Sequence, residues 1–180
     1  MGRKIILRPL AQIDSHILET LEQSLQQTFN CPVEIKPQIG SIDYAHDPKR
    51  RQYLAPLLLS NLRSFKMEPG DRCLGIVDVD LYTPGLNFVF GQADTSSGVA
   101  IISLYHLRQE RYGLPQDEAL FLDRAIKEAV HELGHTYYLN HCPDAKCVMH
   151  FSNSLADTDI KQISFCQRCR AGLEQGGDTG

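Results

Sequence analysis

The segment HELGHTYYLNHCPDAKC, residues 131–147, places three histidines, a glutamate and two cysteines within seventeen positions. It overlaps the end of the strongest helical pattern in the chain, residues 115–138, where apolar residues recur every three or four positions. His131 and His135 are four residues apart, so a helix projects both imidazoles from one face, as a shared metal ion requires. His141 lies six residues further on and would point roughly 240° around the same axis. A chain that uses all three must therefore end the helix and fold back.

Such a reversal would let three neutral imidazoles hold a zinc ion and leave one coordination position open for water. That arrangement is typical of catalytic rather than structural zinc. The metal acidifies the water, and Glu132 can take its proton and pass it to a leaving amine. The five letters H-E-x-x-H also occur by chance in helices, as two surface histidines and a solvated glutamate. The third histidine and the cysteines behind it favour the metal site, with His131, His135 and His141 as ligands.

Four of the six cysteines lie in the last 39 residues, spaced C-x4-C, then an 18-residue gap, then C-x2-C. Four thiolates close the coordination shell of zinc, so a structural site is predicted at Cys142, Cys147, Cys166 and Cys169. Two disulfides, or buried free thiols, are the alternatives. A segment with few large apolar residues gains folding free energy from bound metal. We therefore expect two zinc ions, one catalytic and one structural.

Composition excludes several other function classes. No apolar run approaches the ~20 residues that cross a bilayer. The basic opening loses its apolar character after Leu7, far short of a signal peptide's hydrophobic region. A net charge of −4 argues against a general nucleic-acid binder. The expectation is a cytoplasmic monomer that binds neither membranes nor nucleic acid.

Periodicity and turn residues predict an α/β chain that opens with a β-α-β unit. The predicted elements are strands at 4–10, 33–39 and 72–83, helices at 12–30, 52–65 and 115–138, a hairpin of extended runs at 86–94 and 98–107, and one short final helix within 157–169. The run 72–83, rich in β-branched residues, is expected to be the central strand of the sheet.

The pattern H-E-x-x-H-x-x-G-x-x-H marks the metzincin peptidases, and its extension by C-x4-C-x-M and a later F-C-x2-C-x3-L resembles the archaemetzincins. The extension reads here as His141, Cys142, Cys147, Met149, Phe165, Cys166, Cys169 and Leu173. The resemblance implies one metzincin-like catalytic domain over residues 1–180, with a twisted mixed sheet and flanking helices. Residues 1–138 would form an upper subdomain with the active-site helix, and residues 139–180 a small lower one stabilised by zinc. Met149 would carry the methionine turn, a hydrophobic floor beneath the catalytic zinc.

Position 138 departs from this pattern, because Tyr138 replaces the family's glycine. Glycine permits the sharp turn after the helix, whereas an aromatic residue at positive φ is strained. Asn140 tolerates left-handed geometry better and could share the reversal.

The combined reading predicts a zinc metallopeptidase that hydrolyses peptide bonds through a zinc-activated water, with Glu132 as general base and peptides or proteins as substrates. The alternative is a zinc-stabilised peptide-binding module without turnover. Glu132 counts against that alternative, whereas Tyr138 favours it by its capacity to distort or block the cleft. Asp78 and Asp80 alternate on one predicted strand, where they could bind a cation, orient a group that itself contacts a metal ligand, or simply face solvent.

Overall fold

The computed structural model of the protein describes residues 3–65 and 67–176. The strands are β1 (Ile5–Pro9), β2 (Val33–Ile35), β3 (His46–Asp47), β4 (Gln52–Leu54), β5 (Arg72–Val77), β6 (Leu81–Tyr82), β7 (Gly91–Asp94) and β8 (Val99–Ser103). The α-helices are α1 (Ser15–Phe29), α2 (Ala55–Arg63), α3 (Glu118–Thr136), α4 (Leu155–Ile160) and α5 (Gln167–Gly176). Three short 3₁₀ helices are η1 (Asp43–Ala45), η2 (Tyr105–Leu107) and η3 (Gln109–Tyr112). Within the described ranges, no helix combines the length and the hydrophobicity that crossing a bilayer requires.

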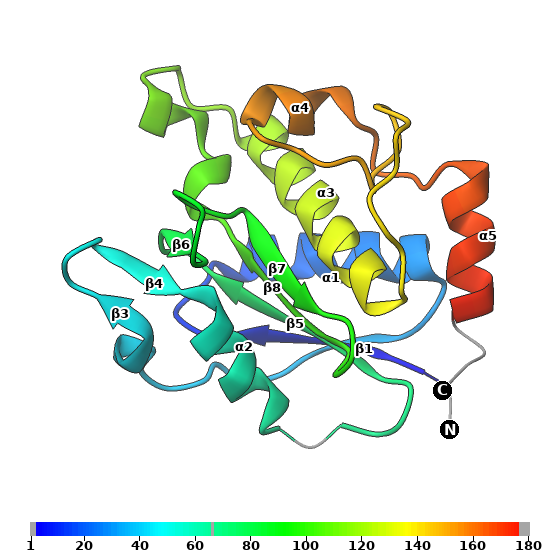
Figure 1. Cartoon of the computed structure of the whole chain (residues 1–180), viewed down its shortest axis with the longest axis horizontal. Helices are drawn as coiled ribbons and strands as arrows, with labels where there is room; N and C mark the ends of the chain where they lie inside the picture. Colours follow the sequence, from blue (N-terminus) through cyan, green and yellow to red (C-terminus); the bar gives the residue numbers. More distant parts are fainter. Residues whose placement is uncertain (1–2, 66, 177–180) are drawn as a thin grey trace.

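A five-stranded mixed sheet in the order β2-β1-β5-β8-β7 forms the centre of the molecule (Figure 1). The first four of these strands are parallel, and β7 pairs antiparallel with β8 at the edge. The predicted β-α-β opening and the hairpin are both confirmed. The strand β5, which begins at residue 72, lies in the middle of the sheet, as expected. All five residues of the neighbouring inner strand β8 are buried, as in a strand that is covered on both faces.

Alternate residues of the central strands face two separate hydrophobic cores. Leu74 and Ile76 point toward α1 and α3, whereas Cys73 and Val77 point toward α2. In Figure 1, α1 and α3 lie on one side of the sheet and α2 on the other. The α3 helix, which carries the histidine motif, is therefore held between the sheet and the C-terminal segment.

Two of the predicted elements divide differently in the structure. Residues 72–83 are not one strand, because β5 ends at Val77 and β6 belongs to a second sheet of order β3-β4-β6. The predicted helix 52–65 begins instead with β4, which pairs with β3 and β6. Pro56 then lies in the first turn of α2, where its missing N–H is not needed. Pairing with distant strands overrides the local helical pattern here.

The C-terminal prediction of one short helix is wrong, because α4 and α5 are separate. α4 starts early through a capping box, in which the Ser154 hydroxyl accepts from the Asp157 N–H and the Asp157 carboxylate accepts from the Ser154 N–H. α5 starts only after Cys166. The expected extended run 86–94 is also shorter, with strand pairing confined to β7.

Candidate metal centres

The α3 helix brings its C-terminal turn into the interior of the protein. Its N-terminus is capped by Asp117, whose Oδ1 accepts a hydrogen bond from the Leu120 N–H at 3.0 Å, so it starts three residues later than predicted. Beyond Phe121 most of its residues are buried. His131, Glu132 and His135 therefore lie on a rigid, packed element.

The chain reverses directly after α3 in a Schellman motif. The Leu139 N–H donates to the Gly134 carbonyl at 3.2 Å, and the Tyr138 N–H donates to the His135 carbonyl at 3.0 Å. Tyr138 takes the left-handed conformation, with φ 65°, at the position where glycine is usual. Asn140 does not share the reversal, because the non-glycine residues with positive φ in the described chain are Asn30, Arg51 and Tyr138.

This reversal brings His141 back to the two helical histidines. One nitrogen from each of the three rings lies within 4.8 Å of the other two, and the Nε2 atoms of His131 and His135 are 3.1 Å apart. The ring centroids of His141 lie 5.3 Å from His131 and 4.9 Å from His135. The structure thus brings together the three predicted catalytic ligands.

Backbone carbonyls orient the two helical imidazoles. The His131 Nδ1 lies 2.8 Å from the Val148 carbonyl oxygen, and the His135 Nδ1 lies 2.7 Å from that of Leu139. Because a carbonyl can only accept, each Nδ1 carries the proton, and each Nε2 presents a lone pair to the shared point. Burial, as the main cause, lowers the pKa values of His131, His135 and His141 below the ordinary value. All three are therefore neutral at pH 7, as metal binding requires.

The spacing of these nitrogens fits zinc. Two nitrogens at the usual zinc distance and a tetrahedral angle lie about 3.3 Å apart, close to the separation of the His131 and His135 Nε2 atoms. Among the residues that the structure describes, no fourth histidine, cysteine or carboxylate joins the three imidazoles. Sets of three protein ligands are typical of zinc sites that keep one position open.

Glu132 is only 7% exposed and lies beside this cluster. Burial raises the pKa of its carboxyl to about 8; the charge of Glu128 adds to the rise and that of Lys161 opposes it. Lys161 and Glu128 form a buried ion pair, with 2.9 Å between Nζ and Oε1. Sequence reasoning missed this pair, and no short-range signal could have revealed it, because α3 and the end of α4 are far apart in the chain.

A cleft of about 480 Å³ opens over the histidines. Its walls come from the segment before β7 and from β7 itself, from the face of α3 and from the segment after Met149. The residues that line it are Thr83, Leu86 to Ala93, Glu128, His131, Glu132, His135, His141 and Phe151 to Asn153. Tyr138 is not among them. It is 60% exposed and lines a different hollow next to Arg72 and Gly98, so it does not block the cleft.

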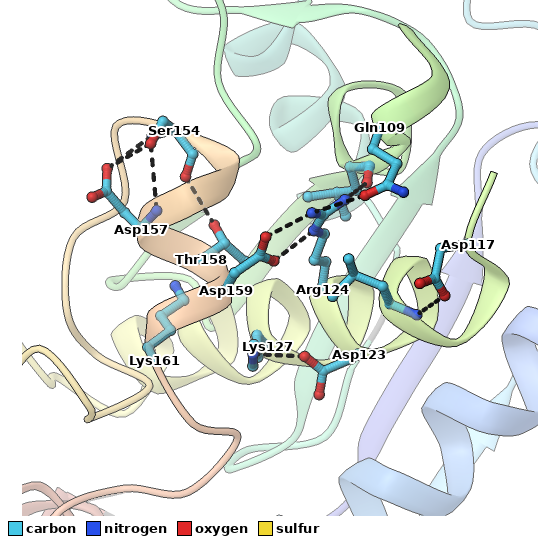
Figure 2. A network of polar contacts seen from close by, with 12 residues as sticks. Gln109, Asp117, Asp123, Arg124, Lys127, Ser154, Asp157, Thr158, Asp159 and Lys161 are labelled. Atoms are coloured by element: carbon cyan, nitrogen blue, oxygen red, sulfur yellow. Dashed lines mark hydrogen bonds and ion pairs between the residues drawn. The ribbon is translucent and has the colours of Figure 1, made fainter. Parts of the chain in front are cut away.

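The helix α4 docks on α3 and follows directly on residues 151–153, which form one wall of the cleft. Arg124 holds both carboxylate oxygens of Asp159 at 2.7 Å and also donates to the Leu107 carbonyl at 3.1 Å. Figure 2 shows α4 across α3 with these two side chains pointing toward each other. Because residues 151–153 immediately precede the N-cap of α4, the contacts of Arg124 with Asp159 help to hold this wall of the cleft in position.

Met149 is fully buried and lies against the C-terminal part of α3. A Cβ atom placed at Gly134 would lie 3.1 Å from the Met149 Cε and closer still to its Sδ, so the glycine lets the methionine pack against the helix backbone. The Met149 carbonyl accepts from the Cys142 N–H at 2.9 Å. Met149 therefore packs against the part of α3 that carries His131 and His135, and its role as the floor of a zinc site stays a prediction.

Four thiols gather behind this turn. One sulfur from each of Cys142, Cys147, Cys166 and Cys169 lies within 4.8 Å of the others. The Cys142 and Cys166 Sγ atoms are 3.8 Å apart, as expected for two sulfurs about 2.3 Å from one tetrahedral zinc and far longer than the ~2 Å of a disulfide. The Cys169 N–H and neighbouring thiols lower the pKa of Cys166 to about 7. The predicted cluster is therefore assembled, and its spacing fits a metal better than two disulfides.

The remaining candidates have protein partners. Asp78 accepts from Arg108 at 2.6 Å, and Asp80 lies 2.9 Å from the His106 Nε2 and accepts from Gln52. A cation is not needed to explain either carboxylate.

Comparison with known proteins places this architecture in one family. The model of peptidase family M54 matches residues 19–175. An archaemetzincin of Pyrococcus abyssi is 43% identical over 95% of this chain and 94% of its own length. The crystal structure of archaemetzincin from Methanopyrus kandleri has a TM-score of 0.84 at 39% identity and covers 97% of this chain and 94% of that one. A zinc-dependent peptidase from Methanocorpusculum labreanum has a TM-score of 0.85 at 30% identity, covering 94% and 99%. The chain therefore belongs to peptidase family M54, the archaemetzincin family of zinc metallopeptidases.

Proposed function

We propose that the protein hydrolyses peptide bonds with His131, His135 and His141 as ligands of a catalytic zinc and Glu132 as general base. The observation that carries this proposal is the convergence of three neutral imidazoles beside a buried carboxyl at the floor of an open cleft. A buried carboxyl without a chemical task costs free energy of folding, which favours a functional role for Glu132.

Zinc held by the three imidazoles would acidify a water molecule and polarise the substrate carbonyl. Glu132 then takes a proton from the attacking water and delivers it to the nitrogen of the leaving amine. A cation beside Glu132 favours the ionised carboxylate, so the raised pKa of the metal-free carboxyl does not prevent it from acting as a base. His131 and His135 keep their Nδ1 protons, because each Nδ1 donates to a backbone carbonyl and each Nε2 stays free to bind the metal.

The substrate backbone is proposed to run along β7. This strand lies at the edge of the sheet and lines the cleft with Gly91 and Gln92. An extended peptide can add to such an edge through main-chain hydrogen bonds, which leaves its side chains free to alternate between the cleft and solvent. Peptides and unfolded protein segments are therefore the proposed substrates.

We further propose that the four cysteines hold a structural zinc, so that the protein binds two zinc ions. Residues 139–180 would then form a lower subdomain beneath an upper one of residues 1–138. The described part of the lower segment holds Met149, the thiol cluster, α4 and α5. Free thiols at zinc spacing support a reducing, cytoplasmic environment, and we propose a monomer that does not bind nucleic acid.

The proposed mechanism is tested with Glu132→Gln in zinc-loaded protein. We expect the wild type to cleave a peptide library and a chelator to abolish cleavage. Glu132→Gln should keep its zinc and lose about 10²- to 10⁴-fold in rate, the usual contribution of a general base. Glu19→Gln, an exposed position on α1, is the matched control and should cleave normally.

Unchanged cleavage by zinc-loaded Glu132→Gln would refute the role of Glu132. Binding of peptides by the wild type without any product would instead support the binding module. The position of Tyr138 outside the cleft removes the sequence feature that favoured that module.

A further inference from the structure

Gly91, the first residue of β7, lies directly against the side chain of Glu132. A Cβ atom placed at Gly91 would lie 2.6 Å from the Glu132 Cγ and 3.0 Å from its Cδ. The φ of Gly91 is not positive, unlike those of Gly70, Gly85 and Gly98. The backbone conformation at this position therefore does not require glycine. What requires glycine is the lack of space for a side chain.

The surroundings of Gly91 leave little room for adjustment. The same Cβ atom would lie 2.7 Å from the carbonyl oxygen of Ile101, which belongs to the fully buried inner strand β8. The face of α3 opposite Glu132 packs against Met149 at Gly134. The helix is thus enclosed between β7 and the methionine, with a glycine at each contact.

We propose that Gly91 is a positioning residue for Glu132, in that a side chain at this place in β7 would displace the carboxylate from the catalytic site. This inference rests on the proposed role of Glu132 as general base. Gly91 and Glu132 both line the cleft, so their contact also sets where a peptide on β7 lies relative to the base.

The first test compares Gly91→Ala with Gly40→Ala in the zinc-loaded protein. Gly40 is exposed, has no atom within 4 Å of a Cβ and no positive φ, so its variant should match the wild type. We expect Gly91→Ala to retain the wild-type zinc content while kcat falls about tenfold or more, since a displacement of about 1 Å can cost 10²-fold. A wild-type kcat for Gly91→Ala would overturn the proposal.

The second test needs no turnover, so it remains informative if the proposed function is wrong. Glu132→Ala removes both atoms that the new Cβ would approach and leaves only the Ile101 carbonyl. Introduced into the wild type, Gly91→Ala should lower the Tm by several degrees. Introduced into the Glu132→Ala variant, the same substitution should lower the Tm clearly less. If Gly91→Ala alone does not fold, the double variant should fold.

Equal losses of Tm in the two backgrounds, or failure of the double variant to fold, would show that the Ile101 carbonyl and not Glu132 excludes a side chain. Either result would overturn the inference, whatever the protein hydrolyses.

Discussion

Lys161 and Glu128 form an ion pair between the end of α4 and the middle of α3, and their side chains are 0% and 4% exposed. The Nζ and Oε1 atoms are 2.9 Å apart, but the lysine makes no well-aligned hydrogen bond with any group, so the contact is mainly electrostatic. Glu128 also lines the cleft one helical turn before Glu132. Two desolvated charges therefore support the wall of the candidate active site.

Removing one partner of this pair should cost more than removing both. Lys161→Met leaves a buried carboxylate uncompensated and is expected to lower the free energy of unfolding by about 3–5 kcal/mol. The double variant Lys161→Met with Glu128→Gln should recover most of that loss. Urea denaturation measures both, with Lys146→Met at an exposed position as the control. A double variant as unstable as the single one would show that the charges are not coupled.

Tyr138→Gly should stabilise the protein. The left-handed conformation costs a non-glycine residue roughly 1 kcal/mol, which glycine avoids at this C-terminal position of the helix. We expect Tm to rise by about 2–4 °C. Tyr138→Ala keeps the strained φ and should bring no such gain. An equal rise in both variants would assign the effect to the exposed ring instead of the backbone.

The stability of the metal-free protein should depend on pH through Glu132. Its pKa is about 8 in the folded state and about 4.3 in an unfolded chain, so folding is penalised as the pH rises from 4 to 8. Glu132→Gln has no such titration. Its stability advantage over the wild type should be near zero at pH 4, reach on the order of 3 kcal/mol at pH 7 and level off above pH 8. Urea denaturation in chelator across this range checks the sign, and a constant difference would contradict it.

Metal analysis should assign one zinc to each cluster. The wild type is expected to bind two equivalents, Cys169→Ser one and His135→Ala one, because each substitution removes a ligand from a single site. Cys169→Ser should also lose much of the stability of its C-terminal segment, since metal binding there contributes to folding. Amide hydrogen exchange of Cys169→Ser should show faster exchange in the C-terminal segment than in the wild type. Two equivalents in Cys169→Ser would place the second zinc elsewhere.

Local patterns in the sequence predicted much of the site. The four-residue spacing of His131 and His135 on a periodic helix places both imidazoles on one face, because helical geometry is set within a few residues. The cysteine spacing indicated a second cluster, and the two extended runs at 86–94 and 98–107 predicted the β7–β8 hairpin. These features depend on neighbouring residues, which is why they could be read without a structure.

Other features depended on contacts between distant segments. The strand β4 forms at residues 52–54 because β3 and β6 supply its hydrogen-bond partners, although the local pattern is helical. Tyr138 takes the left-handed conformation that Asn140 could have shared, because the two hydrogen bonds that end α3 are donated by the N–H groups of Tyr138 and Leu139. The Lys161–Glu128 pair and the contact of Gly91 with Glu132 arise only when α4 and β7 pack against α3. The sequence determined which side chains can bind metal, and tertiary packing decided which buried groups surround them, because burial and charge pairing are set by residues far apart in the chain.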